Sequence, residues 1–199
     1  MSQPQRSQSE VVFAGRLFSV RREPVHHADG SESLYEIVDH PDAAAIVALR
    51  EPAYAATPQA SGNAAGSRLV ALVRQVRPAI GKETLELPAG IVQPDEVDYP
   101  ERTAGRELRE ETGWKANKWQ LLTRQYPSAG FCTEAIWIYL ATGLEEVAGA
   151  APDPHELVGL DWLPLSQALA LCRDGTIDDG KTLVGLFLAA AALGVDGDS

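Results

Sequence analysis

Cysteine, positive charge and long apolar runs are all scarce in this chain of 199 residues. Its two cysteines, Cys132 and Cys172, are too few for a disulfide framework and are typical of a reducing compartment. The longest apolar stretch, Leu183 to Val195, is about a third short of the ~20 residues that cross a bilayer. The 28 acidic side chains outnumber the 17 lysines and arginines, giving a net charge of -11. We therefore expect no broad electrostatic affinity for nucleic acid or anionic lipid.

The N-terminus does not resemble a targeting segment. Residues 1–10 are polar and have no apolar core, so no secretory signal is visible. The first nine residues, rich in Gln and Ser, are predicted to be a flexible tail. The remaining length and the 45% hydrophobic content suit one domain with a substantial core. These features predict a cytoplasmic globular protein.

Short apolar runs typical of strands, together with three helical segments, predict an α+β fold. The predicted strands are 11–13, 17–21, 34–38, 43–49, 69–76, 83–87, 119–125, 135–141 and 161–164. Residues 100–112 are predicted to form a helix, with Pro100 in its first turn and Gly113 just past its end. Further helices are expected at 165–173 and 181–193, and a long loop at 52–67. Strands first, one central helix and terminal helices favour mixed sheets covered by helices.

The central helix carries three carboxylates in one narrow stripe. Relative to Glu107, Glu110 lies about 60° to one side and Glu111 about 40° to the other. Arg106 precedes Glu110 by four residues and can offset its charge, whereas we expect Glu107 and Glu111 to lack a helical cation between them. A hard divalent cation such as Mg²⁺ or Mn²⁺ would relieve this repulsion and join an acidic protein to a phosphate substrate.

A helix rich in Glu and Arg is more often simply a solvated face. The segment before it argues for a site, because a strand ends in Pro88-Ala89-Gly90 and such a turn can present backbone carbonyls to a metal.

With these residues the sequence resembles the Nudix hydrolase family. The family pattern is Gly, five residues, Glu, seven residues, then Arg-Glu-apolar-x-Glu-Glu-x-Gly-apolar, and here it starts at Gly90 and continues as Arg106, Glu107, Leu108, Glu110, Glu111, Gly113 and Trp114. Fifteen residues separate Gly90 from Arg106, where the pattern has thirteen. A two-residue insertion explains the difference and leaves either Glu96 or Asp98 as the middle acid.

The resemblance implies a fold, a cofactor and a set of roles. The fold would be a mixed β-sheet sandwiched between helices, with two or three Mg²⁺ or Mn²⁺ ions at the box helix. Glu107 and Glu111 would be the main ligands, Glu110 would assist, and the Ala89 carbonyl would complete a site. Arg106 would orient the carboxylates while water attacks one phosphorus of a nucleoside diphosphate derivative.

Further stretches resemble the ADP-ribose pyrophosphatase branch. They are 18–21, 36–40, 73–77, 86–90, 129–134 and 175–179. The branch implies Glu134 as the catalytic base and Arg77 as a phosphate contact; the other implied substrate-binding residues are Glu86, Gly130 and Phe131. A plain surface acid at Glu134, or an Arg77 that merely pairs with Glu83 or Glu86, are the simpler interpretations.

The branch implies hydrolysis of ADP-ribose to AMP and ribose 5-phosphate by a homodimer. Residues 10–42 would form an N-terminal antiparallel β region that pairs with the second copy, and 43–195 the hydrolase domain; strands at 10–42 that pack only within one subunit are the alternative. Ala129 stands where the branch usually has Pro, and Tyr35 where it commonly has Arg. Hydrolysis of another nucleoside diphosphate sugar, or binding of a nucleotide without cleavage, therefore remain alternatives.

Overall fold

The computed structural model describes residues 9–51, 68–97, 99–147 and 159–195 and has the predicted α+β architecture. Most of the predicted tail and the predicted loop at 52–67 lie outside the described residues. Two of the three helices, α1 and α2, have the predicted bounds. The elements in chain order are β1 (Glu10–Ala14), β2 (Ser19–His26), β3 (Glu32–Asp39), β4 (Ala43–Arg50), β5 (Leu69–Arg77), β6 (Lys82–Glu86), β7 (Ala89–Ile91), α1 (Pro100–Thr112), β8 (Trp114–Gln125), β9 (Ile136–Glu146), β10 (Gly159–Pro164), α2 (Leu165–Arg173) and α3 (Gly180–Leu193).

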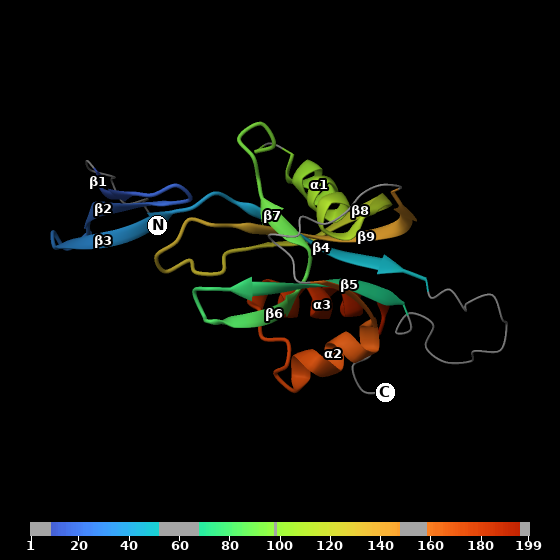
Figure 1. Cartoon of the computed structure of the whole chain (residues 1–199). Helices are drawn as coiled ribbons and strands as arrows, with labels where there is room; N and C mark the ends of the chain where they lie inside the picture. Colours follow the sequence, from blue (N-terminus) through green and yellow to red (C-terminus); the bar gives the residue numbers. More distant parts are fainter. Residues whose placement is uncertain (1–8, 52–67, 98, 148–158, 196–199) are drawn as a thin grey trace.

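A seven-stranded mixed sheet forms the centre of the molecule. Its main path runs β10-β5-β4-β9-β8, with β6 paired to β5 and β7 paired to β4. The pairing of β4 with β9 is parallel, whereas β5 and β7 run antiparallel to β4. Helix α1 covers one face of this sheet, and α2 and α3 lie on the other (Figure 1).

Strand β4 contributes to two hydrophobic cores, one on each face of the central sheet. This explains why its sequence does not alternate between apolar and polar residues. Ala45, Val47 and Leu49 pack with α2 and α3, whereas Ala44 and Ile46 pack with α1. Side chains alternate between the two faces of a strand, so a strand covered on both sides becomes a continuous apolar run. The buried β4 thereby fixes α1 on one face of the sheet, close to the first residues of β4.

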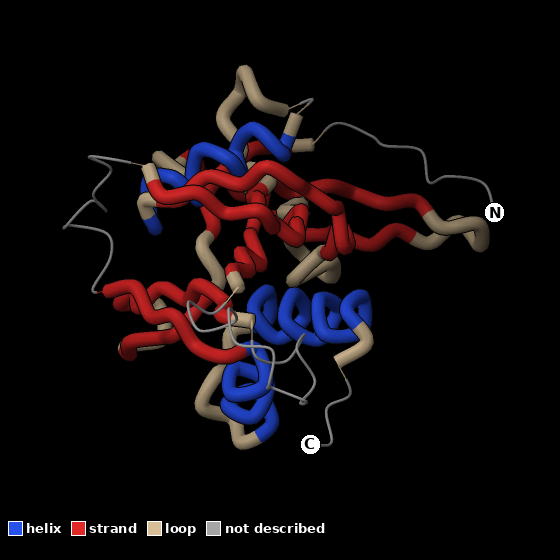
Figure 2. The backbone as a smooth tube through the Cα atoms, turned by 90° about the vertical axis from the view of Figure 1, so that its right-hand side faces the viewer, coloured by secondary structure: helices blue, strands red, loops and turns tan. Residues whose placement is uncertain are grey.

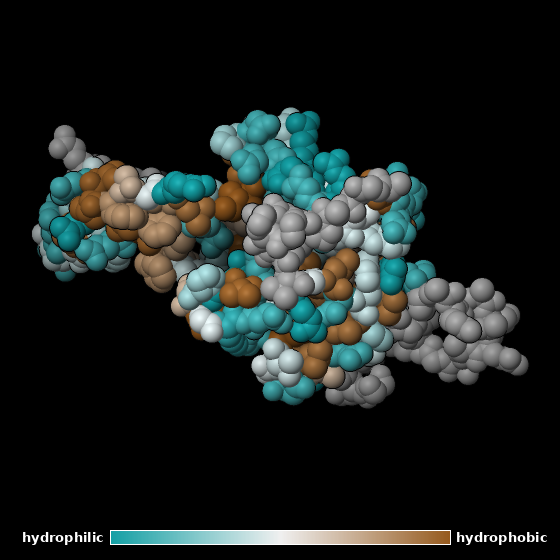
Figure 3. Space-filling model, in the orientation of Figure 1, coloured by the Kyte–Doolittle hydropathy of each residue, from teal (hydrophilic) through white to brown (hydrophobic). Residues whose placement is uncertain are grey.

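The strands β1, β2 and β3 form a separate three-stranded antiparallel sheet. It extends away from the central sheet as an arm (Figures 1 and 2). Several large aliphatic and aromatic side chains on this arm are exposed. Figure 3 shows brown, hydrophobic surface on the arm. The exposed side chains are Val11, Val12, Phe13, Leu17, Phe18, Leu34 and Tyr35.

The predicted turn at Pro88-Ala89-Gly90 is wrong, because Ala89–Ile91 is a short strand, β7. It pairs with Ala43, Ala44 and Ala45 at the start of β4. A local pattern with Pro and Gly indicated a turn, but the backbone of these residues is extended by its pairing with β4. Within the described part of the chain, the helices are too short or too polar to cross a bilayer.

Candidate active site

Helix α1 is positioned by its apolar face and delimited by its end residues. Pro100 occupies the first helical turn, where its missing N–H costs nothing, and Gly113 ends the helix in a left-handed conformation at φ 76°. Ala104 and Leu108 are fully buried against the sheet. Burial of this face presents the flank with Arg106 and the glutamates toward β7.

Arg106 joins three carboxylates and one carbonyl. Its Nη1 lies 2.6 Å from Glu107 Oε1 and 3.1 Å from Glu110 Oε2, and its Nη2 donates to Glu96 Oε2 at 3.3 Å. Nη2 also donates to the Ile91 carbonyl at 3.2 Å, which ties the helix to β7. Burial alone would lower the pKa of Arg106, but its carboxylate partners outweigh burial and raise it. The guanidinium is therefore a permanent cation within the acidic stripe.

These contacts correct one sequence-based expectation. We expected Glu107 to lack a basic companion on the helix, but the adjacent Arg106 reaches it directly. Helical spacing compares Cβ directions, whereas the long arginine side chain turns back across the stripe. The predicted pairing of Arg106 with Glu110 is confirmed.

Glu96, one of the two candidates for the middle acid, contacts the box helix. It accepts from Thr103 Oγ1 at 2.7 Å and pairs with Arg106, and only 14% of its side chain is exposed. The alternative, Asp98, lies outside the described residues.

Glu111 and Gly90 bring the helix and β7 into direct contact. The buried Glu111 accepts from the Ala89 N–H at 3.0 Å. Ile46 N–H donates to the Pro88 carbonyl, and Val92 N–H donates to the Asp42 carbonyl. Hydrogen-bonded and non-hydrogen-bonded pairs alternate along an antiparallel ladder, so Ala89, next to Pro88, directs its N–H and C=O away from β4. The backbone carbonyl of Ala89 therefore lies on the side of β7 that is not paired with β4.

A second ionic network lies beside β7 and centres on Glu86. Arg77 donates to both Glu86 oxygens, from Nε at 2.7 Å and from Nη2 at 2.5 Å. Lys181 of α3 pairs with Glu86 and with Asp179. Burial would raise the pKa of Glu86, yet the Arg77 and Lys181 contacts and a hydrogen bond from Thr84 lower it to about 2.

This network changes how Arg77 and Glu86 can serve a substrate. Only 2% of the Glu86 side chain is exposed, against 40% for Arg77. Glu86 therefore anchors Arg77, which agrees with the simpler interpretation that Arg77 pairs with a nearby glutamate. The guanidinium of Arg77 still reaches the surface. Hydrogen bonds to Glu86 outweigh burial and raise the pKa of Arg77, and the charge of Glu111 adds to this.

The predicted substrate loop is attached to the N-terminal arm. Val38 N–H donates to the Phe131 carbonyl at 2.7 Å, and Thr133 N–H donates to the Val38 carbonyl at 2.9 Å. Glu134 lies 3.6 Å from Nδ1 of His40, with 23% of its side chain exposed. Gly130 and Phe131 are exposed in the same loop.

The start of β4 brings these parts together. Ala43, Ala44 and Ala45 pair with β7 on one edge and with β9 on the other, and Ala43 N–H donates to the carbonyl of Ala135. Neighbouring strands lie about 4.8 Å apart, so the Ala89 segment and the Glu134 end of β9 are separated by roughly 10 Å. Chain segments far apart in the sequence therefore converge at one end of the sheet.

Sequence reasoning missed Lys181, Asp179 and His40 as members of this site. Asp179 caps α3 by accepting from Thr182 N–H at 3.0 Å, and this also brings Lys181 to Glu86. The available signal is Glu86, which is followed by Leu and Pro at the end of a predicted strand. A carboxylate buried there needs a cationic partner, and this could have pointed to Lys181.

The donor set fits a hard cation without forming a complete cage. No group of three or more His, Cys, Asp or Glu side chains in the described ranges is arranged as a ready-made metal site. However, Glu107, Glu110 and Glu111 offer oxygen atoms on one flank of α1, and the Ala89 carbonyl lies next to that flank. Mg²⁺ commonly uses one or two carboxylates and takes its remaining ligands from water and phosphate. These residues therefore fit Mg²⁺ held jointly with a phosphate substrate.

Comparisons with known proteins agree with this geometry. A model of the NUDIX domain matches residues 59–184. The chain is 33% identical to an ADP-ribose pyrophosphatase of Mycobacterium tuberculosis over 186 residues, which cover 92% of this chain and 81% of that one. It is 32% identical to an ADP-ribose pyrophosphatase of Bacillus subtilis over 174 residues, 87% of this chain and 85% of that one. A crystal structure described as an ADP compounds hydrolase superposes with a TM-score of 0.79 at 22% identity, covering 100% of this chain and 98% of that one.

Proposed function

This chain belongs to the Nudix hydrolase family and is a Nudix pyrophosphohydrolase, and we propose that its substrate is ADP-ribose, split into AMP and ribose 5-phosphate. The observation that carries the proposal is the convergence of the Arg106-centred carboxylates, Arg77 and the Glu134 loop at the start of β4. The two relatives described as ADP-ribose pyrophosphatases support this choice of substrate.

The proposed reaction assigns each group a step. A water oxygen forms a bond to one phosphorus, the bond from that phosphorus to the bridging oxygen breaks, and Glu134 accepts the water proton. Arg77 binds the diphosphate, aided by its anchor Glu86, and Gly130 and Phe131 line the sugar side of the loop. Two or three Mg²⁺ ions, or Mn²⁺, bound by Glu107, Glu110, Glu111 and the Ala89 carbonyl, would neutralise the diphosphate and lower the pKa of the attacking water.

The test is release of AMP from ADP-ribose in the presence of Mg²⁺, compared between wild type and Glu111→Gln. The variant keeps the side-chain shape but removes a charge, and we expect kcat to fall by roughly 10²-fold or more. Glu101→Gln is the matched control on the same helix, because Glu101 is exposed and outside the box, and it is expected to retain activity. Wild-type turnover by Glu111→Gln would refute the metal assignment.

Another nucleoside diphosphate sugar is the second candidate, favoured by Tyr35 and Ala129. Both are exposed, on β3 and in the Glu134 loop respectively. A panel of ADP-ribose, ADP-sugars and GDP-sugars decides between the two, since a hundredfold preference for a non-ribose sugar would reject ADP-ribose. Tight binding of ADP-ribose without any product, at all metal concentrations, would instead indicate a nucleotide-binding module.

We also propose that residues 10–42 pair with a second copy of the chain and that 43–195 form the hydrolase domain. The exposed apolar surface of the β1–β3 arm supports this, because such contiguous surface is typical of an interface. Light scattering after gel filtration should give a dimer for wild type and a monomer for the double variant Val11→Ser, Phe13→Ser. A monomeric wild type at micromolar concentration would refute the pairing.

A further inference from the structure

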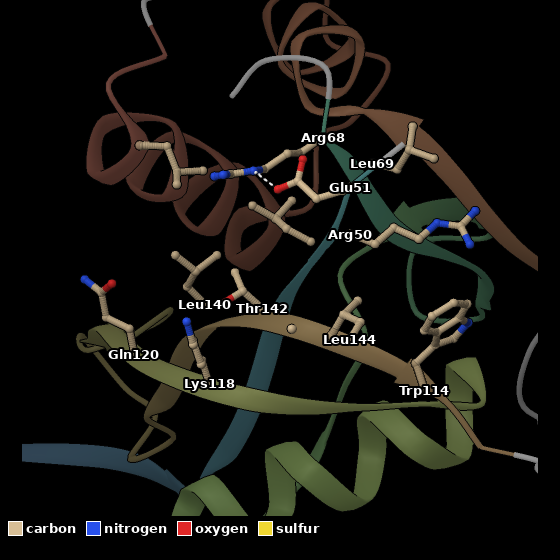
Figure 4. Close-up of a pocket in the computed structure, with 13 residues that line it drawn as sticks. Arg50, Glu51, Arg68, Leu69, Trp114, Lys118, Gln120, Leu140, Thr142 and Leu144 are labelled. Atoms are coloured by element: carbon tan, nitrogen blue, oxygen red, sulfur yellow. Dashed lines mark hydrogen bonds and ion pairs between the residues drawn. The ribbon is translucent and has the colours of Figure 1, made fainter. Parts of the chain in front are cut away.

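A cavity of about 840 Å³ lies at the opposite end of β4 from Ala89 and Gly90, and Trp114, the last residue of the box, is part of its wall. Its walls come from the end of β4, the start of β5, strands β8 and β9, and the last residue of α3 (Figure 4). From Ala44, which faces β7, to Arg50 at the cavity, β4 runs six residues, or about 20 Å at ~3.3 Å per residue. The cavity is therefore distinct from the proposed active site.

The lining of this cavity has the opposite charge balance from the chain. Arg50, Arg68 and Lys118 contribute three cations and Glu51 one anion, in a protein of net charge -11. Arg68 Nε donates to Glu51 at 2.7 Å. The guanidinium of Arg68 and the amino group of Lys118 extend into the cavity from opposite walls (Figure 4). Lys118 forms no ion pair with any described residue, so its charge is available to a ligand.

Arg50 sits at the rim in an unusual environment. Its guanidinium carbon lies 4.2 Å from the ring centroid of Trp162 and 5.2 Å from that of Trp114. Its Nε is buried and has no hydrogen-bond partner among the described parts of the chain. Stacking on two indoles holds this cation in place without neutralising it.

The space between the cations is mostly apolar. Five leucines line it, Leu49, Leu69, Leu140, Leu144 and Leu193, and the uncharged polar side chains of the lining are Gln120 and Thr142. A volume of this size and a mostly apolar wall with a few polar groups are typical of small-molecule sites.

We propose that this cavity is a second small-molecule site, which binds an organic anion composed of a phosphate, sulfonate or carboxylate joined to an apolar or aromatic group. Lys118 binds the anionic group, and the leucines between Lys118 and Arg68 contact the apolar part. The proposal does not depend on which substrate the box hydrolyses.

The test is a fluorescence titration of the full chain with 8-anilinonaphthalene-1-sulfonate, an anion of this class. We expect saturable binding at one site, weakened at least fivefold by Lys118→Glu because charge reversal repels the sulfonate. The uncharged analogue N-phenyl-1-naphthylamine is expected to bind wild type and Lys118→Glu equally. Lys118 is exposed on β8, and Lys118→Gln, expected to weaken binding of the anion at least twofold, replaces the reversal variant if that fails to fold.

Two matched controls distinguish binding in this cavity from binding elsewhere on the protein. Lys115→Glu changes the same strand outside the cavity, and Lys82→Glu changes the cavity that Arg77 lines. Both are expected to keep the dye affinity within twofold of wild type. The proposal is overturned if all three reversals weaken binding equally, if Lys82→Glu has the larger effect, or if the dye shows no saturable binding.

Discussion

Glycine at position 90 is required by space rather than by backbone conformation. Gly90 does not have a positive φ, and any L-residue can adopt the backbone of β7. A Cβ atom there would overlap the carboxylate of Glu107, so the absent side chain is what allows this carboxylate to lie against the strand. Gly90, the first residue of the family pattern, and Glu107, one of its acids, therefore contact each other directly.

Gly90→Ala should displace the Glu107 carboxylate and disturb its contact with Arg106. We expect kcat/KM for the pyrophosphatase reaction to fall about 10²-fold, the usual effect of misplacing an active-site group by an ångström. Gly159→Ala is the control, because its nearest atom, Cδ of Arg74, is 3.8 Å away. If Gly90→Ala shows wild-type kinetics, Glu107 does not need its observed position.

At the scale of elements, helices α1 and α3 each contain an internal glycine, and the two have different surroundings. The nearest atom to a Cβ at Gly105 of α1 would be Trp119 Cζ2, at 3.9 Å. At Gly185 of α3 it would lie 2.6 Å from Leu87 Cδ1 and 3.1 Å from Val47 Cγ2. Gly185 is thus the point where α3 packs directly on the sheet.

The same substitution should therefore change stability in opposite directions. Gly105→Ala is expected to raise the free energy of unfolding by about 0.5–1 kcal/mol, because alanine is the better helix former. Gly185→Ala is expected to lower it by about 1–3 kcal/mol through overpacking. Urea unfolding of both variants measures the two values. A stabilising Gly185→Ala would show that α3 can move away from the sheet without loss.

At the scale of the whole molecule, the Glu86 network connects strands β5 and β6 with helix α3. It joins Arg77, Glu86 and Lys181, whose positions in the sequence span more than half of the chain. The pKa of Glu86 falls from 4.5 to about 2 in the folded protein, despite burial, because of its cationic partners. A depressed carboxyl pKa stabilises the fold above the unfolded pKa and loses that contribution as pH falls toward the folded pKa.

We predict that Glu86→Gln is less stable than wild type by about 3 kcal/mol at pH 7 and that this difference shrinks to about half at pH 3. Urea unfolding at pH 7, 5 and 3 measures it. Glu83→Gln, which removes an exposed partner of Arg74 on the same strand, is expected to change stability by less than about 1 kcal/mol. A difference between wild type and Glu86→Gln that is constant with pH would show that the charge of Glu86 does not contribute.

The limits of α1 and the spacing of its acids could be predicted from local sequence alone. The limits of this helix follow from Pro100 and Gly113, and its stripe of acids from the 3.6-residue repeat, because both depend on neighbours along the chain. The buried run of β4 likewise predicted a central strand. These features are local, so a single sequence carries them.

The partners of these residues depend instead on contacts between segments that are distant in the sequence. The pairing of Ala89–Ile91 with β4 turned an expected turn into a strand, and Lys181 reaches Glu86 from 95 residues away. Arg106 bridges to Glu96 and Glu107 because α1 is pressed against β7, which helical spacing cannot show. Contacts of this kind depend on how distant segments pack, and packing is a property of the whole chain rather than of any local pattern.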